Sequence, residues 1–262
     1  MAYRRRARLL LEMLEPGQGV RILDAGCGEG FYLAAISDVK GDRPVGIDAD
    51  AGRVRRAVDR LSGTAAAGDL RSLPFADGSF DGVLMSEVLE HVEDDRRALG
   101  EAFRVLAPGG ILAISVPHAS FPFWWDPFGR IVQALGLPPM RSGPLVGIWT
   151  GHLRLYHPEE LADRVRDAGF QIERCIEATH HSFPFAHFLL YGIGKPLIEH
   201  GLLPARLQAS TSRFEDSPAE EGPLNPVRLI RTVLAAADRR NDLPARRQPK
   251  TFVNVVLKAR KP

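Results

Sequence analysis

The sequence predicts an α/β protein in which helices cover both faces of a mainly parallel β-sheet. Two observations indicate this fold class. The chain contains short apolar runs bounded by glycine, which are typical of buried strands, and segments whose apolar residues recur at the 3.6-residue period of a helix. The two kinds of segment alternate along the chain, which is typical of α/β proteins. Neighbouring parallel strands are then joined by right-handed crossovers. The 262 residues suffice for one large domain, and a content of 45% hydrophobic and 25% charged residues excludes a disordered or fibrous protein.

The expected strands are short apolar runs bounded by turn residues. They span residues 20–26, 44–50, 64–69, 80–86, 111–117, 170–176 and 252–258. Two of these runs end in acids: Asp48 closes the second, and Asp69 closes the third. Because carboxyl ends of parallel strands meet at one edge of a sheet, we expect these acids near a common site.

Helices are expected between the strands. An amphipathic helix leads the chain, a second spans residues 31–37, and Asp50 can cap a third. A fourth spans residues 93–106 and is stopped by Pro108–Gly109–Gly110. Pro158 takes the first position of a fifth helix, which ends at Gly169.

Charge and cysteine content narrow the function classes. The chain has 34 Lys and Arg against 32 Asp and Glu, a balance that predicts no nucleic-acid partner. Cys27 and Cys175 lie far apart and in no metal-ligand spacing, so neither a disulfide framework nor a zinc site is expected. Glu12 and Glu15 interrupt the apolar part of the N-terminal segment, which therefore differs from a secretion signal. We expect a cytoplasmic protein.

Two long segments break the alternation of strands and helices. Residues 118–157 and 179–250 are too long to be ordinary connections. We interpret the chain, residues 1–262, as a single domain with two insertions that form a cap, the second lying before the last strand. Within the second insertion, Asn225 and Pro226 have the pattern of a helix start.

The stretch "ILDAGCGEG" at residues 22–30 predicts a ligand-binding turn after the first strand. Its glycines remove side chains where a nucleoside-bearing ligand can approach the main chain. A dinucleotide fold would have its third small residue at position 31, where this chain has Phe31. An NAD-dependent oxidoreductase is therefore disfavoured, and Asp48 and Asp69 are candidates to bind a ribose and an adenine.

Several motifs in order resemble one family. "LDAGCGEG", "VGIDAD", "GDLRSLPFADGSFDGVLMSEVLEHV" and "FRVLAPGGILAISVP" are similar to the class I S-adenosylmethionine-dependent methyltransferases of the type 11 group, which includes ubiquinone and menaquinone methyltransferases. The resemblance covers residues 20–117 well and 151–170 moderately. It implies a Rossmann-like, doubly wound sheet of seven strands whose last strand is antiparallel.

The resemblance also implies roles for individual residues, with S-adenosylmethionine as cofactor. Asp24 and the Gly26–Gly30 turn would hold the methionine portion, and Asp48 the ribose. Asp69 with Leu70 would bind the adenine, and Met85 with Ser86 would line the wall beside the sulfonium. The complete implied cofactor set is Asp24, Ala25, Gly26, Cys27, Gly28, Gly30, Asp48, Ala49, Asp69, Leu70, Met85 and Ser86.

No catalytic triad is expected, because a sulfonium donor needs mainly alignment with its acceptor. An acceptor oxygen or nitrogen can still require a base. The candidates are His91, His152 and Tyr156. No metal site is expected, because no carboxylate pattern accompanies the histidines that follow residue 179.

The acceptor is expected to be a small apolar or lipid-like molecule. The insertions hold many aromatic residues, which can line an apolar pocket or can pack the insertions onto the sheet. Arginines cluster at residues 4–8 and 239–247, where they can attract an anionic membrane surface or an acidic substrate, or can simply be solvated charge, which is the commoner explanation. The alternative from another class is a catalytically silent nucleoside-binding module that recruits a protein partner.

Overall fold

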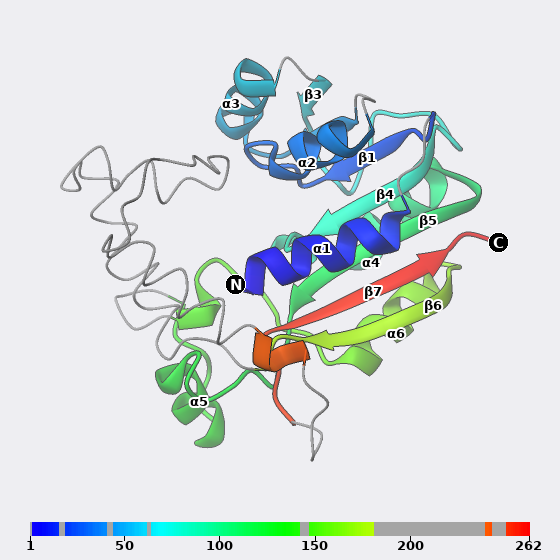
Figure 1. Cartoon of the computed structure of the whole chain (residues 1–262). Coiled ribbons are helices and arrows are strands. Elements are labelled where there is room, and N and C mark those ends of the chain that lie inside the picture. The colour runs from blue at the N-terminus through cyan, green and yellow to red at the C-terminus, as the bar shows by residue number, and fades with distance from the viewer. Residues whose placement is uncertain are drawn as a thin grey trace. The chain divides into compact units, whose positions relative to one another are not determined.

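The computed structural model describes residues 2–15, 19–40, 44–61, 64–141, 147–180, 239–242 and 250–262. Within them it confirms the seven-stranded sheet, whose strands lie in the order β3-β2-β1-β4-β5-β7-β6 (Figure 1). The strands are β1 Ile22–Ala25, β2 Val45–Asp48, β3 Thr64–Ala67, β4 Phe80–Ser86, β5 Leu106–Pro117, β6 Gln171–Ala178 and β7 Asn254–Arg260. All pairs are parallel except those that β7 makes with β5 and β6.

Helices cover both faces of this sheet, as the alternation of patterns predicts. Figure 1 shows α1 (Ala2–Leu14) and α2 (Phe31–Lys40) in front of the sheet, and α4 (Asp95–Val105) and α6 (Pro158–Asp167) behind it. Successive strand residues alternate between the two layers. In β4, for example, Leu84 packs with α1 and α2, whereas Val83 belongs to the core beneath α4 and α6.

Local capping explains where several helices begin. Asp50 Oδ1 accepts hydrogen bonds from the backbone N–H groups of Gly52 and Arg53 at the start of α3 (Ala51–Leu61). Asp94 accepts one from the Arg97 N–H at the start of α4, and Pro158 occupies the first turn of α6. The two aspartates satisfy N–H groups that have no partner within the helix, and Pro158 has no N–H that needs one.

The start of β5 differs from the prediction. The Pro108–Gly109–Gly110 segment was expected to end a helix before a strand at 111, but α4 ends at Val105 and β5 begins at Leu106. Leu106 pairs with Phe80, and the register then shifts so that Gly82 pairs with Ile111. The extra residues form an irregularity in the strand, which the left-handed backbone of Gly109 (φ +79°) allows.

The chain divides into two compact units. One comprises residues 3–119, 153–178 and 254–262 and contains the sheet; the other comprises residues 1–2, 120–152 and 179–253. Described elements of the latter are α5 (Pro127–Ala134), η2 (Gly147–Trp149) and η4 (Arg240–Asp242). Asp126 joins α5 to η2, because its carboxylate accepts from the N–H groups of Gly129 and Ile148 at 2.8 Å each.

Parts of the predicted cap fall outside the described residues. These are the helix expected from Asn225 and Pro226 and most of the 179–250 insertion. Among the residues that the structure does describe, no helix has both the length and the apolar character needed to cross a bilayer.

Candidate cofactor site

The predicted glycine turn joins β1 to α2 and leaves its main chain open. The N–H groups of Gly26 and Cys27 both donate to the Ile47 carbonyl, at 2.7 and 3.0 Å, which ties the turn to β2. A Cβ on Gly26 would lie 2.6 Å from Val88 Cγ2, so this position requires glycine. Gly28 has a φ of +54°, and no atom lies within 4 Å of where its Cβ would be. A ligand can therefore approach the backbone at Gly28.

Asp48, at the end of β2, lies directly beside this turn. Its Oδ2 accepts a hydrogen bond from the Gly28 N–H at 2.9 Å, and its Oδ1 accepts one from the Asp50 N–H at 2.9 Å. A carboxylate has about four acceptor positions, so both oxygens can accept further hydrogen bonds. The side chain is partly exposed. These properties suit a residue that binds ribose hydroxyls.

Asp24, in β1, is a buried acid that receives no hydrogen bond from the described residues. It is 1% exposed, and neither carboxylate oxygen receives a hydrogen bond from any residue that the structure describes. Burial, and secondarily the charge of Asp48, raise the pKa of Asp24 to about 8. An uncompensated buried carboxyl is costly. The arrangement is suited to a ligand that brings a cationic group or hydrogen-bond donors.

The two residues predicted at the end of β4 point to opposite faces of the sheet. Ser86 Oγ donates to the Tyr32 hydroxyl at 3.1 Å and is hydrogen-bonded to Ser115 Oγ at 3.1 Å. Met85 is 1% exposed and lies in the core under α4 and α6. Ser86 is therefore on the α1 and α2 side, and the role of Met85 beside the sulfonium stays a prediction.

The remaining predicted cofactor residues lie at successive strand ends. Asp69 forms a bidentate ion pair with Arg71, which lowers the pKa of the Asp69 carboxyl. Leu70 is buried in the core, and Ala25 and Cys27 are buried at the end of β1 and in the turn. Ala49 is exposed. Binding of adenine by Asp69 and Leu70 stays a prediction.

The predicted bases have very different surroundings. His91 ends the short helix η1 (Leu89–His91), and 44% of its side chain is exposed. His152 belongs to the other compact unit. Tyr156 is fully buried, and its hydroxyl donates to Asp95 Oδ2 at 2.7 Å. Burial and Asp95 together raise the pKa of Tyr156.

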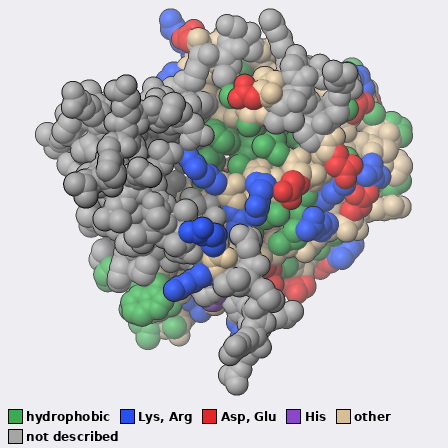
Figure 2. Space-filling model, viewed as in Figure 1, with side chains coloured by type: hydrophobic (Ala, Val, Ile, Leu, Met, Phe, Trp, Pro, Cys, Tyr) green, Lys and Arg blue, Asp and Glu red, His purple; other side chains and the backbone are tan. Residues whose placement is uncertain are grey.

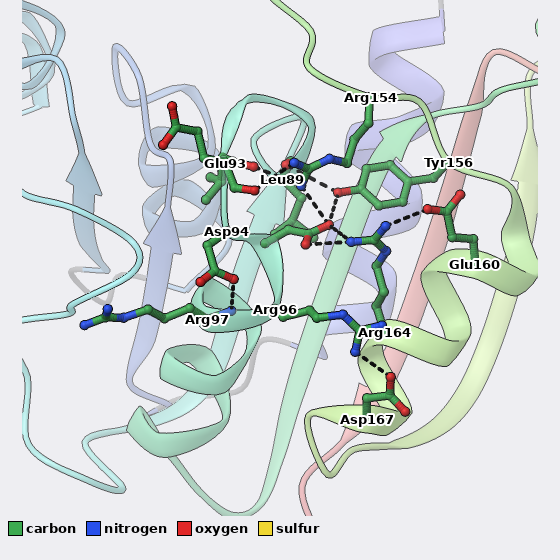
Figure 3. A network of polar contacts seen from close by, with 12 residues as sticks. Leu89, Glu93, Asp94, Arg96, Arg97, Arg154, Tyr156, Glu160, Arg164 and Asp167 are labelled. Carbon is green, nitrogen blue, oxygen red and sulfur yellow. Dashed lines mark hydrogen bonds and ion pairs between the residues drawn. The ribbon is translucent and has the colours of Figure 1, made fainter.

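Tyr156 belongs to a polar network that connects α4 to the chain around α6. Figure 3 shows Arg154, Tyr156 and Arg164 converging, and the acid at their centre is Asp95, the first residue of α4. Burial opposes ionisation of Asp95, but the Tyr156 hydrogen bond and the two arginines outweigh it and lower the pKa of Asp95. This position favours a structural role for Tyr156, because its hydroxyl already donates its hydrogen bond to Asp95.

Sequence analysis missed a second polar cluster at the carboxyl edge of the sheet. Glu87 follows β4 directly and pairs with Arg6 of α1 at 2.9 Å. Asn254, the first residue of β7, donates through Nδ2 to both Glu87 oxygens at 3.1 Å each. Nearby, Glu90 is fully buried, and this burial, with the charge of Glu87, raises its pKa. The only sequence signal was a polar residue at position 254 in an otherwise apolar run.

This fold and site define a nucleoside-binding α/β protein with ligand groups at the carboxyl edge of its sheet. A family model described as a methyltransferase domain matches residues 23–114. A probable S-adenosylmethionine-dependent methyltransferase of Mycolicibacterium smegmatis is 30% identical over 217 residues, which cover 82% of this chain and 72% of that protein. The chain belongs to the S-adenosylmethionine-dependent methyltransferases.

Two further comparisons agree with this assignment. The O-methyltransferase resE of Aspergillus sclerotiorum is 30% identical over 200 residues, 72% of this chain and 69% of that protein. A solved S-adenosylmethionine-dependent methyltransferase of Thermotoga maritima, described as a possible histamine N-methyltransferase, matches with a TM-score of 0.56 at 20% identity. That match covers 100% of this chain and 92% of the other, and it shows the shared fold.

S-adenosylmethionine is the cofactor, and the residues at the turn fit it. The buried, unsatisfied Asp24 carboxyl suits the cationic methionine end, and the open main chain at Gly28 leaves room for the ligand. Asp48 can accept hydrogen bonds from the ribose. When bound, the cofactor supplies a methyl group activated on a sulfonium.

Proposed function

We propose that this methyltransferase acts on a small apolar, lipid-like acceptor. The observation that carries cofactor binding is the Asp24 carboxyl, buried without a described partner beside the turn at Gly28. The similarity to methyltransferases over most of the chain favours transfer activity over a catalytically silent module. The matching of residues 23–114 to a methyltransferase domain supports the same choice.

The chain's own contribution is to bind, orient and exclude water. Asp48 and the glycine turn would hold the adenosyl portion and so orient the cofactor, which would supply the methyl group. Transfer to an acceptor hydroxyl would form the oxygen–methyl bond, break the methyl–sulfur bond to leave S-adenosylhomocysteine, and release the hydroxyl proton. We assign His91 as the base that takes this proton, because its side chain is exposed after the end of β4, whereas the Tyr156 hydroxyl is buried and committed to Asp95.

Asp48→Ala tests the cofactor site. We expect S-adenosylmethionine to bind more weakly by about 1 to 3 kcal/mol, because charge-assisted hydrogen bonds to the ribose are lost. Titration calorimetry measures this change. Asp50→Ala is the matched control: it removes a helix cap two residues away and should lower stability slightly while affinity for S-adenosylmethionine is unchanged. Unchanged affinity in Asp48→Ala would remove Asp48 from the site.

The apolar character of the acceptor is inferred from aromatic side chains in the first insertion. The phenylalanine and tryptophan residues of this insertion within the described residues are Phe121, Phe123, Trp124, Trp125, Phe128 and Trp149. The aromatic residues of the second insertion, at 183–191 and 214, lie outside the described residues. Methyl-transfer assays that compare lipid-like acceptors with polar peptides and nucleic acids test the acceptor class, and transfer to the polar substrates alone would contradict it.

We further propose that the enzyme meets this acceptor at a membrane surface through α5 and its flanks. Figure 2 shows hydrophobic side chains gathered over α5. The large exposed apolar residues of this segment are Phe123, Trp124, Phe128, Ile131, Leu135 and Leu137, of which Leu135 is 67% and Trp124 59% exposed. Contiguous exposed apolar surface rich in aromatics is typical of interfacial membrane binding.

Vesicle binding tests the proposed membrane contact. We expect the parent chain to co-sediment with vesicles of phosphatidylglycerol and phosphatidylcholine, and Trp124→Glu/Leu135→Glu to remain in the supernatant. Val58→Glu, which changes an exposed apolar residue of α3, is the control and should still co-sediment. Equal sedimentation of the parent and the double variant would contradict the proposal.

A further inference from the structure

The Glu87–Asn254 pair lies at the carboxyl edge of the sheet. Glu87 follows the last residue of β4, and Asn254 pairs with Pro117 at the end of β5 and with Ala178 at the end of β6. The antiparallel direction of β7 thus places the start of this strand among the carboxyl ends of its neighbours. Ligands of open α/β sheets bind at this edge.

Asn254 presents one oxygen with no described partner. Its Nδ2 donates to both Glu87 oxygens, and this fixes the amide orientation, because the reverse orientation would oppose Oδ1 to a carboxylate. The residue is 1% exposed, and no residue that the structure describes donates to Oδ1. Buried acceptors in folded proteins nearly always have a partner, so this oxygen points to a ligand.

The backbone and ionic contacts of Glu87 hold this oxygen in place. Glu87 has a φ of +53°, a left-handed conformation that is uncommon outside glycine and is concentrated at functional sites. Arg6 pairs with the Glu87 carboxylate from α1. Burial alone would lower the pKa of Arg6, but Glu87, Tyr32 and Glu90 together outweigh burial and raise it. Glu87 is therefore held between Arg6 and Asn254.

We propose that Asn254 Oδ1, oriented by Glu87, accepts a hydrogen bond from a hydroxyl group of the acceptor. The inference rests on the proposed function and narrows its substrate class to apolar molecules that carry a hydroxyl. Asn254 is a specificity-determining residue in this assignment, and Glu87 is a positioning residue. A site with a buried acceptor atom rejects an analogue without the hydroxyl, because the atom would then be left unpaired.

Binding of matched probes to the protein loaded with S-adenosylhomocysteine tests this assignment. The probes are 2-naphthol against naphthalene and 4-butylphenol against butylbenzene, each pair differing in one hydroxyl. We expect the parent chain to prefer the hydroxyl member of at least one pair by about tenfold or more. Asn254→Ala should abolish the preference. Glu87→Gln, which keeps the packing, should reduce it because the paired amides can reverse.

Lys258→Met is the matched control. Lys258 lies in the same strand and on the same face as Asn254, about 13 Å along the strand, and it is buried in ion pairs with Glu15 and Glu173. This variant loses a buried polar group as Asn254→Ala does, but it should keep the hydroxyl preference. Calorimetry should give an affinity for S-adenosylmethionine within about threefold of the parent in all three variants, since none removes a cofactor contact.

The outcomes separate this inference from the proposed function. No hydroxyl preference in the parent chain, or a preference that persists in Asn254→Ala, would overturn the hydroxyl assignment. A parent chain that fails to bind S-adenosylmethionine would overturn the proposed function. Binding of S-adenosylmethionine without hydroxyl preference would overturn the hydroxyl assignment alone.

Discussion

Asp24 makes the cofactor site a source of instability in the ligand-free protein. Its pKa of about 8 lies above the ordinary value of 3.8, so the folded state retains a proton that the unfolded chain loses between these values. The stability linked to this group is complete below about pH 4 and is lost as the pH rises toward about 8. The resulting loss in the free energy of unfolding is on the order of a few kcal/mol at neutral pH.

Asp24→Asn should remove this pH dependence. We expect the ligand-free variant to gain stability over the parent at pH 8 and to gain little at pH 5, while S-adenosylmethionine binds about tenfold more weakly or worse. Urea unfolding at the two pH values and calorimetry measure these effects. Asp59→Asn, on the exposed surface of α3, should change neither. Equal gain at both pH values would mean that the Asp24 carboxyl does not titrate as described.

At the scale of elements, the Asp95 network is expected to hold α4 and α6 together without taking part in the chemistry. Tyr156→Phe removes the 2.7 Å hydrogen bond to Asp95 and keeps the ring packing. Stability should fall by about 1.5 to 3 kcal/mol, the usual contribution of a hydrogen bond to a charged group, while Arg154 and Arg164 still pair with Asp95. Cofactor affinity and the methyl-transfer rate per folded molecule should persist. A loss of rate with unchanged stability would restore Tyr156 as a catalytic candidate.

Local signals predicted the elements well, because caps, glycine turns and apolar periods act within a few residues. Asp50 and Pro158, for example, mark helix starts that the structure confirms. The start of β5 was wrong because Leu106 pairs with Phe80, a contact that local pattern does not encode. The Asn254–Glu87 pair was not predicted either, because its members are 167 residues apart in the chain and local patterns do not encode such contacts. Gly28 was predicted from the glycine turn, Asp48 from its place at a strand end, and Asp24 from the family resemblance, whereas their hydrogen-bonding state required the fold.

For the whole molecule, cofactor binding should raise thermal stability. A ligand at one hundred times its dissociation constant adds about 2.7 kcal/mol, which corresponds to a rise in Tm of roughly 5 to 10 °C for a chain of this size. S-adenosylmethionine and S-adenosylhomocysteine should both produce the rise, and NAD should not. Thermal unfolding followed by circular dichroism measures it. A rise with NAD alone would contradict the cofactor assignment.

Because β7 lies between β5 and β6, the sheet can be completed during synthesis only after β7 is available. Residues 254–260 form the strand that joins β5 to β6, which do not pair with each other. A chain still being translated therefore exposes a free edge on β5, and β6 has no place in the sheet, until those residues leave the ribosome. Newly made enzyme is consequently vulnerable to edge-to-edge aggregation up to that moment, and chaperone occupancy on the nascent chain should end there.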